Sequence, residues 1–67
     1  MSADVLSPRQ VDVLLLMAHG HTGAEISKRL DLPRWTVEMY RQHGMDSIGA
    51  TTRADVIGWA LREGRFR

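Results

Sequence analysis

The stretch EISKRLDLPRWTV, residues 25–37, decides the fold. Ile26 and Leu30 are four residues apart, a spacing that places both side chains on one face of a helix. Pro33 cannot continue a helical hydrogen-bond ladder, and it biases the residue before it away from helical geometry. The residues after Pro33 again favour a helix. The stretch therefore predicts a short helix, a tight turn and the start of a second helix, the arrangement called a helix-turn-helix.

Capping patterns around this stretch predict where three helices begin. In a capping box, a Ser or Thr and a residue three positions later each bond the backbone N–H of the other. The candidate pairs are Ser7 with Gln10, Thr22 with Glu25, and Thr52 with Asp55. We expect helices over about 8–18, 22–30, 34–43 and 53–63, with Gly44 ending or kinking the third. No segment alternates as a strand does, so the expected fold is all-α, in one domain over 1–67.

Composition excludes several classes of function. The 67 residues hold no cysteine, which excludes disulfides and Cys-based zinc sites. No run approaches the roughly 20 apolar residues of a membrane span, and nothing at the start suggests export, so we expect a cytoplasmic protein without a membrane partner. No phosphate-binding loop, paired acids or Ser/His/Asp arrangement is present, so we expect no enzyme and no cofactor. The three histidines, His19, His21 and His43, indicate cations near helix ends rather than a metal site.

Charge leaves the partner open. The formal net charge is only +1. Residues 27–43 hold four cations and two anions, and the tail adds Arg62, Arg65 and Arg67 against Glu63. Such a distribution fits either ordinary surface charge or the electrostatic footprint of a nucleic-acid binder.

The order and spacing of several short motifs resemble a known family. These motifs are Leu6-Ser7-Pro8-Arg9, Val13-Leu14, Ala18-x-Gly20, Glu25-Ile26-x-x-Arg29-Leu30, Thr36-Val37, Gly49, Arg53-x-Asp55 and Ala60. Together they resemble the C-terminal DNA-binding domain of the LuxR/GerE (FixJ/NarL-type) regulators over most of the chain. The resemblance implies a four-helix domain whose helix-turn-helix lies at about 22–43, and whose third helix, about 34–43, enters the major groove of double-stranded DNA.

The resemblance also implies which side chains face the bases. Carried over by position, these are Glu38, Met39 and Gln42. Gln42 can bond adenine through two hydrogen bonds, Glu38 can accept from cytosine N4, and Met39 can pack on a thymine methyl group. The alternative for Glu38 is a solvated position on the helix surface.

Cations and one hydroxyl are the candidates for phosphate contacts. Arg34, Thr36 and Arg41 lie on the third helix, and Lys28 on the second is a further candidate. Thr36 has the alternative of supporting the helix start through its hydroxyl. Trp35 either lies against a sugar-phosphate strand or covers the edge of the core, and we favour the core edge.

The chain departs from the family pattern at several positions. The family usually has Gly at position 31, Ser at 33, His at 40, an aliphatic residue at 44, Lys near 47 and often a cation at 38. This chain has Asp31, Pro33, Tyr40, Gly44, Ser47 and Glu38. These changes remove positive charge or helix propensity, so they bear on affinity and sequence preference rather than on the fold.

Apolar residues in the first and fourth helices exceed what one face of each requires. Family members commonly dimerise through the fourth helix, so the resemblance implies a homodimer through the helix at about 53–63. The expected interface residues are Val56, Trp59, Ala60 and Leu61, with Trp59 and Leu61 as anchors. The alternative is that loops and termini cover these residues within one monomer.

Two functions follow from these observations. The first is a sequence-specific DNA-binding transcriptional regulator, acting as a homodimer on an inverted repeat. The second is a protein-interaction module on the same scaffold, which binds another regulator or an RNA polymerase subunit. We expect a stand-alone small protein of a bacterium or a bacteriophage, because Met1 and the residues after it resemble a natural start.

Overall fold

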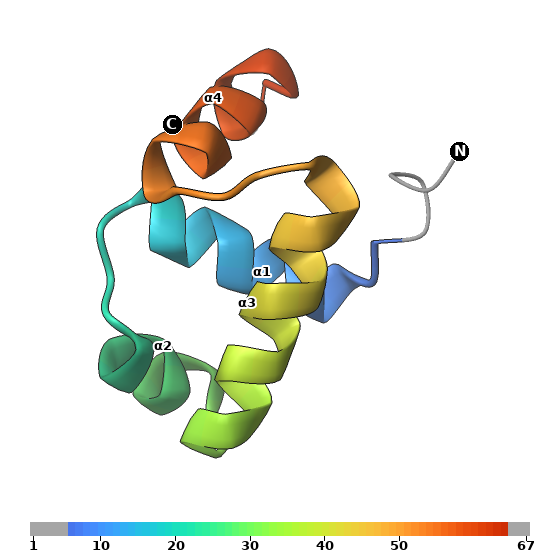
Figure 1. Ribbon diagram of the computed structural model, residues 1–67. Coiled ribbons are helices and arrows are strands. Elements are labelled where there is room, and N and C mark those ends of the chain that lie inside the picture. The colour runs from blue at the N-terminus through green and yellow to red at the C-terminus, as the bar shows by residue number, and fades with distance from the viewer. Residues whose placement is uncertain (1–5, 65–67) are drawn as a thin grey trace.

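The computed structural model describes residues 6–64, and four helices build this part of the chain. They are α1 (Pro8–Ala18), α2 (Gly23–Leu30), α3 (Arg34–Ile48) and α4 (Arg53–Arg62). α1 packs against each of the other three helices. α2 lies beside the start of α3 and α4 lies near its end, so α3 links the two halves of the molecule (Figure 1). The predicted all-α fold of four helices is confirmed, with no strand in residues 6–64.

Side-chain caps begin three of these helices at the predicted residues. Ser7 Oγ accepts a hydrogen bond from the Gln10 N–H at 3.2 Å, and Gln10 Oε1 accepts one from the Ser7 N–H at 2.9 Å. The same reciprocal bonds join Thr22 to Glu25 and Thr52 to Asp55. Each cap satisfies backbone donors that the first helical turn leaves unpaired, so the helix starts are set locally.

The turn between α2 and α3 depends on Asp31. This residue adopts a left-handed conformation, with φ 56° and ψ 49°. Ser27 holds both sides of the turn, because its carbonyl accepts from the Leu32 N–H at 3.0 Å and its hydroxyl donates to the Leu32 carbonyl. Pro33 then serves as the N-cap of α3 in an extended conformation, without a side-chain cap bond. The turn predicted from Asp31 to Pro33 is confirmed.

One face of each helix contributes to a single hydrophobic core. Its buried members are Val13, Leu14, Met17, Ala18, Ile26, Val37, Met45, Ala50, Val56, Trp59 and Ala60. Val11, Leu15 and Leu16 are half-buried and pack against this core. Most of the apolar surplus on α1 is therefore covered within one protomer. In residues 6–64 the exposed large hydrophobic side chains are Trp35, Met39 and Leu61.

α3 is longer than the sequence predicts, because Gly44 does not end it. The helix continues past His43 to Ile48 and ends at Gly49. Gly44 is buried where α3 approaches α1, and a Cβ placed on it would lie 3.1 Å from Leu14 Cδ1. The missing side chain thus permits close packing of the two helices. This tertiary contact outweighs the helix-propensity cost of glycine, about 1 kcal/mol.

Candidate nucleic-acid interface

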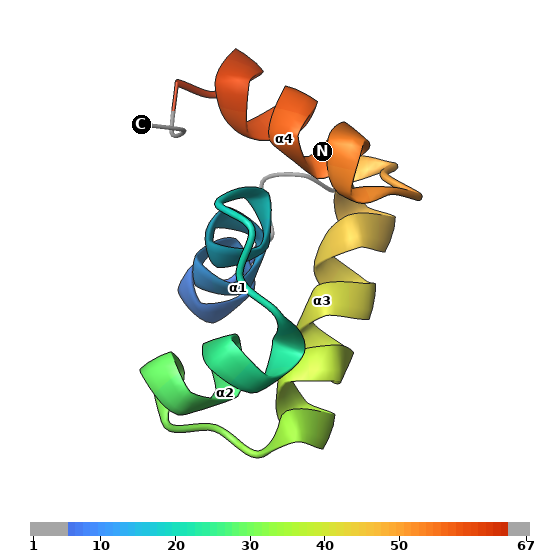
Figure 2. The ribbon, with the colours of Figure 1, turned by 90° about the vertical axis from the view of Figure 1, so that its left-hand side faces the viewer.

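α3 turns one stripe of side chains away from the core. Trp35, Met39, Gln42 and Asp46 recur at helical spacing and all are exposed. Val37, on the opposite side, is completely buried. We call the four exposed residues the α3 stripe. α2 lies against the first half of α3 and supports it from one side (Figure 2), so the stripe is carried by a braced helix.

The start of the α3 stripe is apolar. The side chain of Trp35 is 69% exposed and that of Met39 is 39% exposed. Our expectation that Trp35 covers the edge of the core is therefore wrong. The reason is helical geometry: Val37 faces inward from the same turn, and a residue two positions away points elsewhere. Trp35 and Met39 are neighbours at i, i+4 spacing, so they present apolar surface together.

Glu38 and Arg41 form an ion pair beside the stripe. Arg41 Nε and Nη2 both donate to Glu38 Oε1, at 2.9 and 2.7 Å. Arg41 Nη1 lies 3.7 Å from Met45 Sδ, so every nitrogen of the guanidinium has a partner within the protein. The i, i+3 spacing of the pair is visible in the sequence, although our prediction treated the two residues separately.

Arg34 and the second oxygen of Glu38 meet at the start of α2. A Cβ placed on Gly23 would lie 3.0 Å from Glu38 Oε2 and 3.2 Å from Arg34 Nε. Glycine at position 23 therefore leaves room for both side-chain ends. Arg34 and Glu38 both reach the first residue of α2, a convergence that sequence reasoning missed because it depends on how α2 packs on α3.

The remaining predicted residues are spread over two helices. Gln42 Nε2 donates to Asp46 Oδ1 at 3.3 Å, so the amide already has an exposed acceptor within the stripe. Thr36 is half-buried in the first turn of α3. Lys28 is exposed in the last turn of α2, where its charge also favours the helix C-terminus. The structure thus pairs Glu38 with Arg41 and places Arg34 near Glu38 at Gly23. Met39 and Gln42 lie along the α3 stripe.

Burial changes which residues of α4 are available to a partner. Val56 and Ala60 are completely buried and Trp59 is 7% exposed, all within one protomer. These three side chains, which the sequence predicts as interface contacts, already fill the core and offer little surface to a partner. Leu61, by contrast, is 59% exposed.

A different set of residues forms the outer side of α4. Ala54 and Leu61 are exposed, and Ile57 and Gly58 are half-buried. We call these four residues the α4 face. Their spacing of three, four and seven residues places them on one side of the helix. That spacing is present in the sequence, but the sequence alone does not say which side of α4 faces the core.

Other candidate sites lack the chemistry of a ligand site. His19 Nδ1 lies 2.8 Å from the Leu15 carbonyl oxygen, and His21 Nδ1 lies 3.6 Å from Glu25 Oε1. Within residues 6–64, no three His, Cys, Asp or Glu side chains gather as metal ligands would. None of the helices described by the structure combines the length and the apolar character needed to cross a bilayer.

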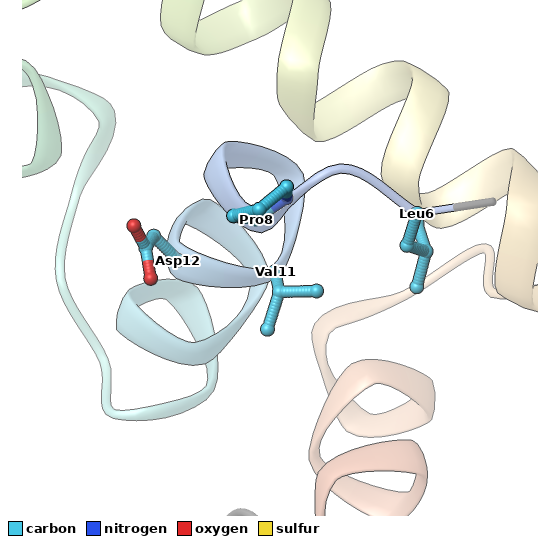
Figure 3. Close-up of a pocket in the computed structure, with 4 residues that line it drawn as sticks. All are labelled: Leu6, Pro8, Val11 and Asp12. Atoms are coloured by element: carbon cyan, nitrogen blue, oxygen red, sulfur yellow. The ribbon is translucent and has the colours of Figure 1, made fainter. Parts of the chain in front are cut away.

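A pocket lies at the start of α1 (Figure 3). It is lined by Leu6, Pro8, Val11 and Asp12. The one carboxylate among these residues lies 3.5 Å from Arg9 Nη1, so its charge already has a partner. The pocket does not gather the several polar groups that fix a bound small molecule.

A short turn that aligns two helices, and an exposed stripe on the second of them, define a helix-turn-helix protein. Residues 4–60 match the family of bacterial regulatory proteins, luxR family. The chain belongs to this family, which confirms the resemblance noted in its sequence.

Several relatives are transcriptional regulators. The chain is 37% identical over 62 residues to the HTH-type quorum sensing-dependent transcriptional regulator VjbR of Brucella ovis, covering 92% of this chain and 24% of the relative. It is 36% identical over 62 residues to the transcriptional regulatory protein MctR of Rhizobium johnstonii, covering 92% of this chain and 29% of the relative. The oxygen regulatory protein NreC of Staphylococcus aureus is 30% identical over 59 residues, which are 88% of this chain and 27% of the relative.

The chain therefore spans about a quarter of the length of these relatives. What it shares with them is the helix-turn-helix unit. Because the family is one of bacterial regulatory proteins, and VjbR and MctR are transcriptional regulators, membership supports DNA-binding transcription regulation as the class of function.

Proposed function

We propose that this chain binds double-stranded DNA sequence-specifically and regulates transcription as a homodimer, with the first half of α3 in the major groove. The observation that carries the proposal is the α3 stripe, on a helix braced by α2 in a chain of the luxR family. Its place of action is the bacterial cytoplasm, where that DNA lies.

In this proposal the bases of the site face Met39 and Gln42, while Glu38, the third side chain that the resemblance assigns to the bases, is paired with Arg41. The exposure of Met39 suits contact with a thymine methyl group, the apolar feature of the major groove. Gln42 Nε2 carries a second N–H beside the one donated to Asp46, and its carbonyl oxygen accepts, so the amide can bond adenine through both atoms.

Phosphates face Arg34, Arg41 and Thr36, with Lys28 as a further contact from α2. The Arg34 side chain lies at the start of α3 beside Gly23, and the Arg41 side chain pairs with Glu38 one turn before it on the same helix. Such contacts hold the helix in register on the duplex, while the base contacts distinguish sequences.

Fluorescence anisotropy with duplex DNA at increasing salt tests the proposal. Binding should weaken as salt rises, because phosphate contacts release counterions, with a slope in log–log form of about −0.9 for each phosphate neutralised. Arg34→Ala and Arg41→Ala should each reduce the magnitude of that slope by about one contact. Binding that is insensitive to both substitutions would exclude this placement of α3.

The homodimer is proposed to form through the α4 face. Leu61 supplies the large exposed apolar side chain of that face, and Gly58 allows a second helix to approach closely. A dimer would present two α3 helices to two half-sites, and its twofold symmetry requires an inverted repeat in the DNA.

The second candidate function is a protein-interaction module, whose partner is another regulator or an RNA polymerase subunit. The observation that favours it is the composition of α3, where Glu38 and Asp46 offset Arg34 and Arg41 while Trp35 is exposed. A stoichiometric complex with such a protein, lost in Trp35→Ala, together with no duplex binding at low salt would support this function instead.

A further inference from the structure

We propose that Glu38 competes with DNA for Arg41: the carboxylate holds the guanidinium in the free protein, and a backbone phosphate displaces it when DNA binds. The inference rests on the proposed binding of α3 to DNA. It gives Glu38 a role opposite to that of a base contact, because the carboxylate then weakens binding to every sequence.

The geometry of the pair is that of an arginine bound to an oxyanion. Two nitrogens of Arg41 converge on one oxygen of Glu38, at 2.9 and 2.7 Å. A phosphate oxygen can accept hydrogen bonds from the same two donors, because the planar guanidinium of arginine binds carboxylate and phosphate in the same geometry. The third nitrogen lies against Met45 Sδ. A phosphate can therefore gain the forked contact with Nε and Nη2 of Arg41 only by replacing Glu38.

The pair is accessible to such a competitor. The side chain of Arg41 is 37% exposed and that of Glu38 is 43% exposed. An exposed ion pair is weak, since water and salt screen the attraction between its charges. DNA, with its dense array of phosphates, can therefore displace the carboxylate without disturbing the core.

The carboxylate of Glu38 also lies near a second arginine, Arg34. Glu38 Oε2 and Arg34 Nε both lie close to the position that a Cβ on Gly23 would take. Glu38 thus pairs with Arg41 and lies near Arg34, the two cations proposed to bind phosphate. The cluster carries a net charge of 2 − 1 = +1, and a neutral side chain at position 38 would leave both positive charges uncompensated.

The test compares Glu38→Gln with the wild-type chain on duplex DNA, by anisotropy over a range of salt. Glutamine keeps the shape of the side chain and removes its charge. We expect Glu38→Gln to bind about two- to fivefold more tightly at low salt, the equivalent of one exposed ion pair. The gain should occur on random-sequence duplex as well as on a selected site. The slope against salt should become steeper by up to about 0.9.

Asp12→Asn is the matched control. Asp12 pairs with Arg9 at the same i, i+3 spacing, and both side chains are about as exposed as those of the Glu38 pair. It changes the net charge of the chain by the same amount but lies on α1. A gain in Asp12→Asn equal to that in Glu38→Gln would overturn the proposal, because the effect would then be one of overall charge.

A second comparison uses Arg41. In the Arg41→Ala background, Glu38→Gln should lose most of its gain, because the guanidinium that the carboxylate holds is gone. An undiminished gain in that background would exclude competition for Arg41. Weaker binding of Glu38→Gln to a selected site, with random DNA unaffected, would instead assign Glu38 to cytosine recognition.

These results separate this inference from the proposed function. Wild-type binding to duplex DNA with equal behaviour of Glu38→Gln and Asp12→Asn would contradict only the role of Glu38. No duplex binding by the wild type and by Glu38→Gln at low salt would contradict the proposed function, and this inference with it.

Discussion

Asp31 occupies a backbone conformation that most residues avoid. Its φ of 56° places it in the left-handed region, where glycine has no steric penalty and where other residues lose about 1 kcal/mol or more. The turn still forms, because Ser27 bonds the backbone of Leu32 from both sides and α2 and α3 are held in the core. The strain at this position is thus compensated by its surroundings.

We expect Asp31→Gly to raise the free energy of unfolding by about 0.5–1 kcal/mol, measured by urea denaturation at pH 7. The gain is reduced by the greater freedom of glycine in the unfolded chain. Asp31→Asn is the control, because it removes the charge near the end of α2 without removing the Cβ. A less stable Asp31→Gly variant would contradict the account of the turn.

Gly44 and Gly58 lie within helices, and the stability of their alanine variants can be compared. A Cβ on Gly44 would lie 3.1 Å from the buried Leu14 side chain, whereas on Gly58 it would approach only Arg62 Nη1, at 3.3 Å. Gly58→Ala should stabilise the fold by about 1 kcal/mol through helix propensity, because the end of Arg62 can move.

Gly44→Ala should be less stable than Gly58→Ala by about 1–3 kcal/mol, the usual cost of overpacking a core. Thermal or urea unfolding of the two variants side by side measures this difference. Equal stabilisation by both substitutions would show that Leu14 yields freely, and that Gly44 is not required for the approach of α1 and α3.

Single residues also show where the sequence was insufficient. The i, i+3 spacing of Glu38 and Arg41 indicates their pairing, since both lie on one helix. The position of Arg34 beside Gly23 could not be predicted, because it requires the packing of two helices. The exposure of Trp35 was mispredicted for a related reason: large apolar residues are usually buried, and only the orientation of α3 shows that this one is not.

At the scale of the helices, local signals predicted starts better than ends. The capping boxes involve residues three positions apart, so they are visible without tertiary information. The sequence predicts an end of α3 at about residue 43, because glycine has low helix propensity, but the helix continues through Gly44 to Ile48. Contact with Leu14 provides the reason for glycine at that position, and no local pattern contains it.

Two of the capping boxes should make stability depend on pH. The pKa of Asp55 lies below its ordinary value, chiefly because its carboxylate accepts a hydrogen bond from the Thr51 N–H. The Thr51 hydroxyl and the Thr52 N–H donate to the same carboxylate and lower the pKa further. The Thr22 N–H lowers the pKa of Glu25 in the same way. A carboxylate with a lowered pKa stabilises the fold above its unfolded-state pKa, about 4, and this contribution is lost as pH falls through the folded-state value.

We therefore expect the urea midpoint to fall between about pH 5 and pH 2, and to fall less in Asp55→Asn. The α1 box supplies the control, because its Ser7 and Gln10 side chains do not titrate in this range. Ser7→Ala should lower stability by about 1 kcal/mol at each pH. A pH profile of Asp55→Asn that is parallel to the wild type would contradict the capping role of this carboxylate.

For the molecule as a whole, we propose self-association into a homodimer. One protomer already buries Val56, Trp59 and Ala60, so the dimer proposed here depends on the α4 face. Leu61→Glu should weaken the dimer at least about tenfold while leaving the fold intact, because it places a charge at an apolar contact. Sedimentation equilibrium over a range of protein concentrations measures this change.

Trp35→Glu is the matched control for that experiment. It makes the same apolar-to-acidic change at an exposed residue, but on α3, so it should leave self-association unchanged. Wild-type protein that sediments as a monomer at every concentration would contradict the proposed dimer. The proposal that α3 binds DNA would then remain, with one recognition helix for each site.

We propose that this small domain distinguishes DNA sequences with one braced helix. Selection of the wild-type chain against a pool of random duplexes tests it most directly, because the method assumes no operator. We predict enrichment of an inverted repeat, whose two half-sites lose their enrichment when Gln42→Ala and Met39→Ala are selected in parallel. A pool that stays random after repeated rounds at low salt would contradict the claim.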